Sequence, residues 1–151
     1  MGRLKRISFT PTIDTSIYAS GDVLFATTEV VGAVPTAMSA VIRAVTLHDK
    51  DDEGVAIDLY FLRDNVSFGT INNAPSMSDA DGDMVTSKVS IAAADYLDMG
   101  GVQVATVGDL YCPIEADPGT TKIYVAGVVN ATPTYAAASD IVIDLWITDE
   151  A

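Results

Sequence analysis

Alternation of apolar and polar residues is the strongest pattern in the sequence, and it predicts β-strands. In residues 55–62 an aliphatic or aromatic residue takes every second position, with Asp58 and Tyr60 between them. A period of two is typical of a strand with one buried face and one solvated face. Residues 41–47 alternate in the same way, and the acidic run 49–54 between the two segments has the composition of a turn. The sequence therefore predicts an antiparallel hairpin from these two segments.

Five further segments are predicted to be strands, with turn residues between them. They cover residues 22–28, 85–91, 102–107, 122–129 and 141–147. The last two are expected to form a second hairpin that mirrors the first. Ser78 belongs to the residue types that cap helices, so one short helical turn is expected after it. Seven or eight short strands with no βαβ rhythm predict an all-β fold: an antiparallel β-sandwich, jelly-roll-like, with at most one or two short helical turns.

Composition agrees with this fold class and narrows the function. The chain holds 17 Val, 12 Ile and 15 Thr, whose branched side chains suit a pleated sheet. Hydrophobic residues make up 49% of the 151 residues, whereas 21 acidic against 8 basic residues give a formal charge of −13. The apolar content excludes a disordered acidic chain, and the negative charge argues against nucleic acid as a partner. No stretch approaches the roughly 18 apolar residues of a membrane span, so no membrane contact is expected.

Positive charge is concentrated at the N-terminus, where Arg3, Lys5 and Arg6 are three of the eight bases. Such a run is either a solvated, flexible start or a basic arm that docks on an acidic partner surface. We therefore expect two parts: a basic N-terminal arm over residues 1–11 and a single β-sandwich domain over residues 12–151.

Residues suited to catalysis are scarce. His48 is the only histidine and Cys112 the only cysteine, so one chain can form neither a disulfide nor a four-ligand zinc site. The sequence contains no Gly-x-Ser-x-Gly nucleophile elbow, no Walker loop and no dinucleotide-binding glycine pattern. The prediction is a protein that is not an enzyme, with no catalytic residues and no cofactor. A Cys–His pair, or a hydrolase built on paired carboxylates, is the alternative.

Two acidic segments resemble cation-binding loops. Residues 49–54 imitate the first half of an EF-hand loop, but Tyr60 stands where the bidentate glutamate is needed. Asp79, Asp81 and Asp83 place three carboxylates within five residues, with a glycine one position too early. Both segments are interpreted as solvated turns that bind no metal. A structural Ca²⁺ ion, more readily at the second segment, is the alternative.

Residues 57–60 and 143–146 share one order: an aliphatic residue, Asp, Leu and a large aromatic residue. The match is either a coincidence between two strands with one solvated face or the trace of a remote duplication. In both segments the aromatic residue, Tyr60 or Trp146, lies opposite the aliphatic face. A large aromatic side chain there is a candidate interface anchor, unless neighbouring loops cover the ring.

Several short motifs together give the chain a family resemblance, which extends over residues 12–149. They are Tyr18-Ala19-Ser20-Gly21-Asp22-Val23, Ile57-Asp58-Leu59-Tyr60-Phe61, Asn73-Ala74 followed by Ser78-Asp79-Ala80-Asp81, Ile123-Tyr124-Val125, Pro133-Thr134-Tyr135, and Asp140-Ile141 through Leu145 to Asp149. With these motifs the chain resembles the capsid decoration, or cement, proteins of tailed bacteriophages. The basic start of the chain has no counterpart in this resemblance.

The resemblance implies a β-sandwich without catalytic activity that binds the outside of a phage capsid. Its partner would be the major capsid protein, it would self-associate as a homotrimer, and it would stabilise contacts between capsomers. Its location would be the capsid exterior of the virion, after synthesis in the host cytoplasm. The candidate contact residues are Arg3, Lys5, Arg6, Tyr60 and Trp146. The alternative function is a β-sandwich recognition module, such as a head-fibre or carbohydrate-binding domain.

Overall fold

A computed structural model describes residues 3–35 and 38–149. Over these residues the chain forms ten strands, one short α-helix and one 3₁₀ turn. The strands are β1 (Leu4–Phe9), β2 (Val23–Val30), β3 (Ser39–Asp49), β4 (Ile57–Leu62), β5 (Val85–Ile91), β6 (Tyr96–Asp98), β7 (Gln103–Val107), β8 (Cys112–Glu115), β9 (Ile123–Val129) and β10 (Ile141–Thr148). The α-helix is α1 (Asp79–Gly82), and the 3₁₀ turn is η1 (Ala93–Asp95).

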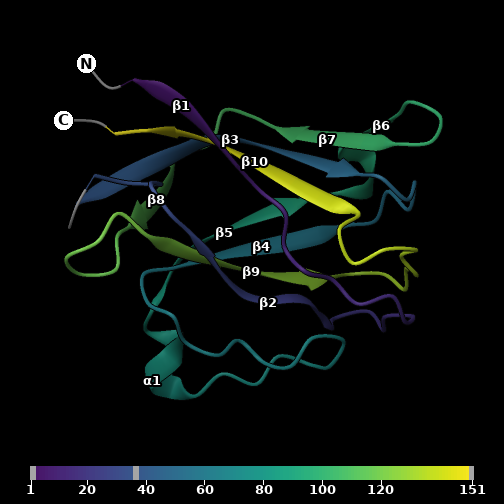
Figure 1. The fold of residues 1–151 in the computed structure, drawn as a ribbon, viewed down its shortest axis with the longest axis horizontal. Coiled ribbons are helices and arrows are strands. Elements are labelled where there is room, and N and C mark those ends of the chain that lie inside the picture. The colour runs from purple at the N-terminus through teal and green to yellow at the C-terminus, as the bar shows by residue number, and fades with distance from the viewer. Residues whose placement is uncertain (1–2, 36–37, 150–151) are drawn as a thin grey trace.

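The strands pack as two antiparallel sheets, one above the other (Figure 1). Sheet A has the order β1-β10-β3-β7-β6, and β8 pairs with the other end of β3. Sheet B has the order β2-β9-β4-β5. The prediction of an all-β antiparallel sandwich with two short helical turns is thus confirmed.

The core lies between the sheets and follows the predicted alternation. Ile57, Leu59 and Phe61 of β4 are fully buried, as are the alternate residues Ile143 and Leu145 of β10. Each fully buried aliphatic side chain of this size contributes about 1.5–3 kcal/mol relative to an exposed one. Alternation also explains why residues 57–60 and 143–146 look alike. They lie in opposite sheets, and both turn their aliphatic residues inward and an Asp and an aromatic residue outward.

The two predicted hairpins are wrong, although their strands exist. β3 belongs to sheet A and β4 to sheet B, so the chain crosses between the sheets at residues 50–56. β9 and β10 are separated in the same way, and the pairs that form are β3 with β10 and β4 with β9. The chain thus passes from sheet A to sheet B between β3 and β4, and from sheet B back to sheet A between β9 and β10, so the same two segments pair in both sheets. This connection is typical of jelly rolls. Alternation identifies the buried face of a strand but not its neighbour, because any strand with the same period offers the same face.

Asp49 explains why the acidic run after β3 forms a tight corner. Its carboxylate is fully buried and accepts backbone N–H groups from Asp51 at 3.0 Å and from Gly54 at 2.8 Å. Burial raises the pKa of Asp49 in spite of these hydrogen bonds. The segment that imitates an EF-hand loop therefore directs its first carboxylate to the backbone of its own turn.

Three strands were not predicted from the alternation of apolar and polar residues: β1, β6 and β8. Residues 4–9 of the predicted arm form β1, which pairs with β10 along its whole length and places Leu4 opposite Thr148. The basic run is therefore largely an edge strand of the sandwich. β6 and β8 are only three and four residues long, too short for a period of two to be recognised.

The segment between β4 and β5 covers the outer side of sheet B. Within it, Ser78 caps α1 as predicted, since its Oγ accepts the N–H of Asp81 at 3.1 Å. Phe68 from this segment packs in a second apolar cluster with Tyr124 and Val128 of β9. Figure 1 shows the segment and α1 lying beyond β2 and β9 on the side away from sheet A.

Candidate contact surface on the outer side of sheet A

No described segment covers the outer side of sheet A in the way that residues 63–84 cover sheet B. The inward residues of β10 alternate with Val142, Asp144 and Trp146, which point outward. The strand registers add the outward neighbours on the adjacent strands. We call this surface the open face, and it consists of Arg6 and Ser8 of β1, Val142, Asp144 and Trp146 of β10, Ala44, Thr46 and His48 of β3, and Val104 and Thr106 of β7.

Two of the predicted contact residues lie side by side at one end of the open face. Arg6 stands opposite Trp146 in the register of β1 and β10, and Ala44 flanks the tryptophan on the other side. The indole Nε1 of Trp146 donates a hydrogen bond to Oγ1 of Thr46 at 3.3 Å, so the ring is held in place while part of it stays exposed. Tryptophan and arginine are among the residue types most often found at the energetic centre of protein interfaces, and here an oriented, partly exposed tryptophan lies beside an arginine.

The structure separates the other three predicted residues from this pair. Tyr60 points outward from sheet B, where the ring of Phe68 covers it with ring centroids 5.0 Å apart. Lys5 alternates with Arg6, and its ammonium group donates to the carbonyl of Gly32 at 2.7 Å. Arg3 is exposed and precedes β1. Of the two aromatic anchors, therefore, Trp146 lies on the uncovered sheet and Tyr60 on the covered one.

Asp144 is the centre of a polar cluster on the open face that joins three strands. Its Oδ1 accepts the hydroxyl of Ser8 at 2.6 Å, and its Oδ2 lies 3.2 Å from Nε2 of His48. The cluster contains the residue types of a serine hydrolase in a different order. A catalytic histidine must lie between serine and aspartate to take the serine proton. Here the aspartate lies in the middle, so His48 has no contact that would activate Ser8.

The surroundings of Asp144 favour its charged form. Burial alone would raise its pKa, but the hydrogen bonds from Ser8 and His48, with the charges of His48 and Arg6, outweigh burial and hold the pKa below the ordinary value. A carboxylate with a lowered pKa in the folded state stabilises the fold above its unfolded pKa, near 4. That contribution is lost as the pH falls through the folded pKa.

Replacing Asp144 by Ala is expected to destabilise the domain by roughly 1–3 kcal/mol at pH 7, because the Ser8 hydroxyl and the His48 ring lose their shared acceptor. Asp144→Asn keeps an acceptor of the same shape but removes the charge. This variant should therefore lose less stability than the wild type between pH 7 and pH 3. Urea unfolding at the two pH values measures the effect. An equal loss in both proteins would show that Asp144 does not contribute to acid sensitivity.

The acidic residues considered as calcium ligands, Asp79, Asp81 and Asp83, do not point toward a common site. Asp79 and Asp81 lie in the single turn of α1, where residues two apart point to different sides, and Asp83 follows as its C-cap. In residues 3–35 and 38–149, no three His, Cys, Asp or Glu side chains are grouped so that they could hold a metal ion.

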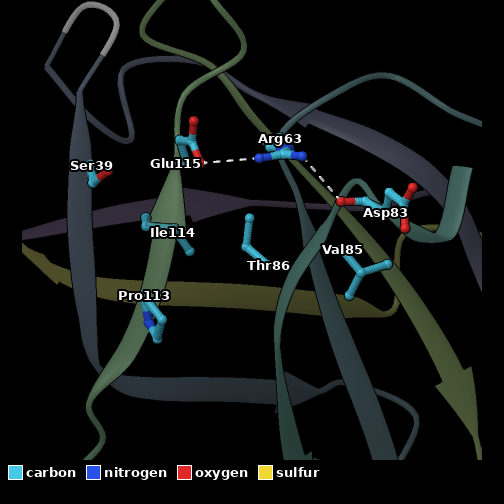
Figure 2. A pocket seen from close by; sticks show the side chains of 8 residues that line it. All are labelled: Ser39, Arg63, Asp83, Val85, Thr86, Pro113, Ile114 and Glu115. Atoms are coloured by element: carbon cyan, nitrogen blue, oxygen red, sulfur yellow. Dashed lines mark hydrogen bonds and ion pairs between the residues drawn. The ribbon is translucent and has the colours of Figure 1, made fainter. Parts of the chain in front are cut away.

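A hollow of about 290 Å³ lies where β8 of sheet A faces β5 of sheet B (Figure 2). Arg63 spans its upper end, with Nη1 3.5 Å from the carboxylate of Glu115 and Nη2 donating to the carbonyl of Asp83 at 3.3 Å. Both charged side chains are substantially exposed, so the ion pair contributes at most about 1 kcal/mol. Arg63 already pairs with groups of the same chain and is not free to bind a ligand. Its contacts with Glu115 and Asp83 instead connect the edges of the two sheets.

The sequence pattern did not reveal two features of this side of the sandwich. The Ser8–Asp144–His48 cluster joins residues up to 136 positions apart, and only their outward position in alternating strands hints at it. At the bulge in β3, Arg43 lies 5.9 Å from the ring centroid of Tyr111, which is 69% exposed. Tyr111 lies in the loop between β7 and β8, where the sequence has no alternation that would predict this cation–π contact.

Comparison with known proteins gives no family. No protein-family model and no curated protein matches the sequence. Among solved structures, similarity is found to a chain of the infectious bursal disease virus particle, with 14% identity and a TM-score of 0.41 over 97% of this chain and 31% of that chain. A Desmodium yellow mottle tymovirus chain matches with 12% identity and a TM-score of 0.29 over 98% of this chain and 81% of that one. An insecticidal delta-endotoxin of Bacillus thuringiensis matches with 12% identity and a TM-score of 0.35 over 97% and 23%.

The chain thus spans about a third of the length of the first of these proteins. The identities and TM-scores are too low to carry an argument about function. Among the described residues, no helix has the length and apolar character needed to cross a bilayer. The function must therefore be inferred from the open face itself.

Proposed function

We propose that this protein is a structural component of a virion that binds the outer surface of a phage capsid and stabilises contacts between capsomers. The observation that carries the proposal is the open face, a sheet surface that presents Trp146 and Arg6 with no described segment over them. The sequence resemblance to phage decoration proteins points to the same role, and it makes the major capsid protein the partner.

The chemistry of the open face suits binding better than catalysis. The order of Ser8, Asp144 and His48 provides no base for the serine hydroxyl. The apolar side chains of Ala44, Val104 and Trp146 are partly exposed, and burying them against a second protein would remove apolar area from water. At about 25 cal/mol per Å², a few hundred Å² of such area is a substantial driving force for association.

Binding to capsids that lack this protein tests the proposal directly. The purified chain is mixed with such capsids and sedimented, and cryo-electron microscopy of the pellet locates any bound density. We expect saturable binding, with density on the outer surface at sites shared by neighbouring capsomers. Failure to sediment with capsids, or density confined to the interior, would contradict the proposal.

The homotrimer is a separate part of the proposal, because it rests on the resemblance alone. Light scattering after size exclusion measures the mass of the free protein, and a trimer has three times the 15.8 kDa of one chain. If the protein is a monomer in solution and still binds capsids, the proposed capsid role holds and the proposed homotrimer is wrong.

A further inference from the structure

The open face ends in a hollow of about 330 Å³ at the His48 end of β3. Its lining combines Arg6, His48 and Lys50 with one carboxylate, Asp144, and two apolar residues, Val102 and Val142. The sequence offers no hint of this hollow, because its lining comes from β1, β3, the turn after β3, β10 and the turn before β7. It adjoins the predicted contact residues, since Arg6 belongs both to the hollow and to the pair with Trp146.

The charge of the hollow is opposite to that of the rest of the molecule. The chain carries −13 overall, yet two of its eight Lys and Arg residues line this one hollow together with the only histidine. The single acid there is already engaged, because Asp144 accepts from Ser8 and lies against His48. Among the described residues, neither Arg6 nor Lys50 forms an ion pair within the chain. Two cations are therefore left to face solvent above an occupied carboxylate.

We propose that this hollow receives a carboxylate side chain, Asp or Glu, of the protein on which the open face docks. The identity of that protein as the capsid subunit rests on the proposed function. A guanidinium group can hold a carboxylate through two parallel hydrogen bonds, and the lysine adds a mobile point charge beside it. Val102 and Val142 form apolar walls that strengthen the attraction once a partner excludes water.

A carboxylate from a protein fits the hollow better than a nucleic-acid phosphate. A polyanion would have to approach a molecule whose net charge repels it along its whole length, whereas one acidic side chain needs only the local field. The neighbouring Trp146 points to the same occupant. A buried aromatic residue with a charge at its rim is typical of protein interfaces, in which the charge fixes the orientation and rejects wrong partners.

Charge reversal at Lys50 tests the inference. Lys50 is exposed, and its described hydrogen bond within the fold is the backbone N–H that donates to Asp140, which a side-chain change leaves intact. Lys50→Glu is expected to weaken capsid binding by roughly tenfold or more, which equals about 1.4 kcal/mol or more, whereas Lys50→Arg should bind within about twofold of the wild type. The matched control is Lys88→Glu, which makes the same charge change at an exposed position of β5 in sheet B and should also stay within about twofold.

Each outcome decides a different statement. If the wild type binds capsids and Lys50→Glu binds with the same affinity, the hollow does not receive a carboxylate, but the proposed capsid role is unaffected. An equal loss in Lys88→Glu also overturns it, because net charge would then explain the effect. If Lys50→Glu instead changes the mass of the free protein, the hollow binds a second copy and the stated partner is wrong. If the wild type fails to bind capsids, the proposed function fails, and with it the capsid subunit as the source of the carboxylate.

Discussion

Replacing Gly127 by Val is expected to unfold the domain or to remove most of its stability. Gly127 lies in the middle of β9, opposite Phe25 of β2 on one side and Leu59 of β4 on the other. A β-carbon at this position would lie 2.9 Å from two ring carbons of Phe25 and closer still to a third. Phe25 is fully buried and packs edge-to-face on Phe9 at 6.4 Å, so its ring has no room to withdraw.

The size of the effect follows from the packing of the core. Overpacking by one or a few methyl groups typically costs about 1–3 kcal/mol, which we expect for Gly127→Ala, and Gly127→Val should cost more than that. A domain of this kind has only about 5–15 kcal/mol of total stability. Chemical unfolding followed by circular dichroism measures the loss. Gly108→Val is the control, because nothing lies within 4 Å of a β-carbon at that exposed position.

A double mutant separates the contact with Phe25 from a general weakness of strand β9. Phe25→Leu creates space above Gly127, so Gly127→Ala should cost less stability in that background than in the wild type. Coupling energies between residues in contact are typically about 0.5–3 kcal/mol. Strictly additive losses would show that the ring of Phe25 is not what requires glycine at this position.

Replacing Trp146 by Ala is expected to weaken capsid binding by about thirtyfold or more while the domain stays folded. The expected loss corresponds to about 2 kcal/mol, the threshold for residues that dominate an interface. Trp146 points away from the core, and the hydrogen bond from its Nε1 to Thr46 orients the ring on the open face. Sedimentation with capsids gives the change in affinity, and thermal unfolding gives the change in stability.

Tyr60→Ala is the matched control for this prediction. Tyr60 occupies the equivalent outward position of the repeated motif, but its ring packs against Phe68. Its truncation should lower the stability of the domain, while the folded protein keeps its affinity for capsids. If Trp146→Ala changes only stability, or if both variants lose affinity equally, the open face is not the contact surface.

The sequence placed most strands within a few residues, because alternation is a local property that each strand carries by itself. The segment 85–91 is strand β5 with the predicted bounds, and Ser78 caps the helix predicted after it. The basic run at the N-terminus shows the limit of this approach. Its charges suggested an arm, yet residues 4–9 form an edge strand whose outer side faces solvent and therefore tolerates bases.

The difference between Tyr60 and Trp146 shows what tertiary structure adds to the candidate site. Both residues follow the same local pattern, and both point away from the core. Both are partly buried, but only Tyr60 packs against a residue of segment 63–84, Phe68. The hollow around Lys50 depends in the same way on strands that are distant in sequence.

By itself, the sequence determined the fold class and which side of each recognised strand faces the core, because side chains alternate with period two along any strand. The tertiary structure decided which strands pair, which sheet stays uncovered, and which polar residues meet on it. These choices depend on contacts between segments up to 136 residues apart, such as Ser8 with Asp144. They are fixed by the packing of the two apolar sheet faces against each other and by the path of residues 63–84, which cover sheet B and not sheet A.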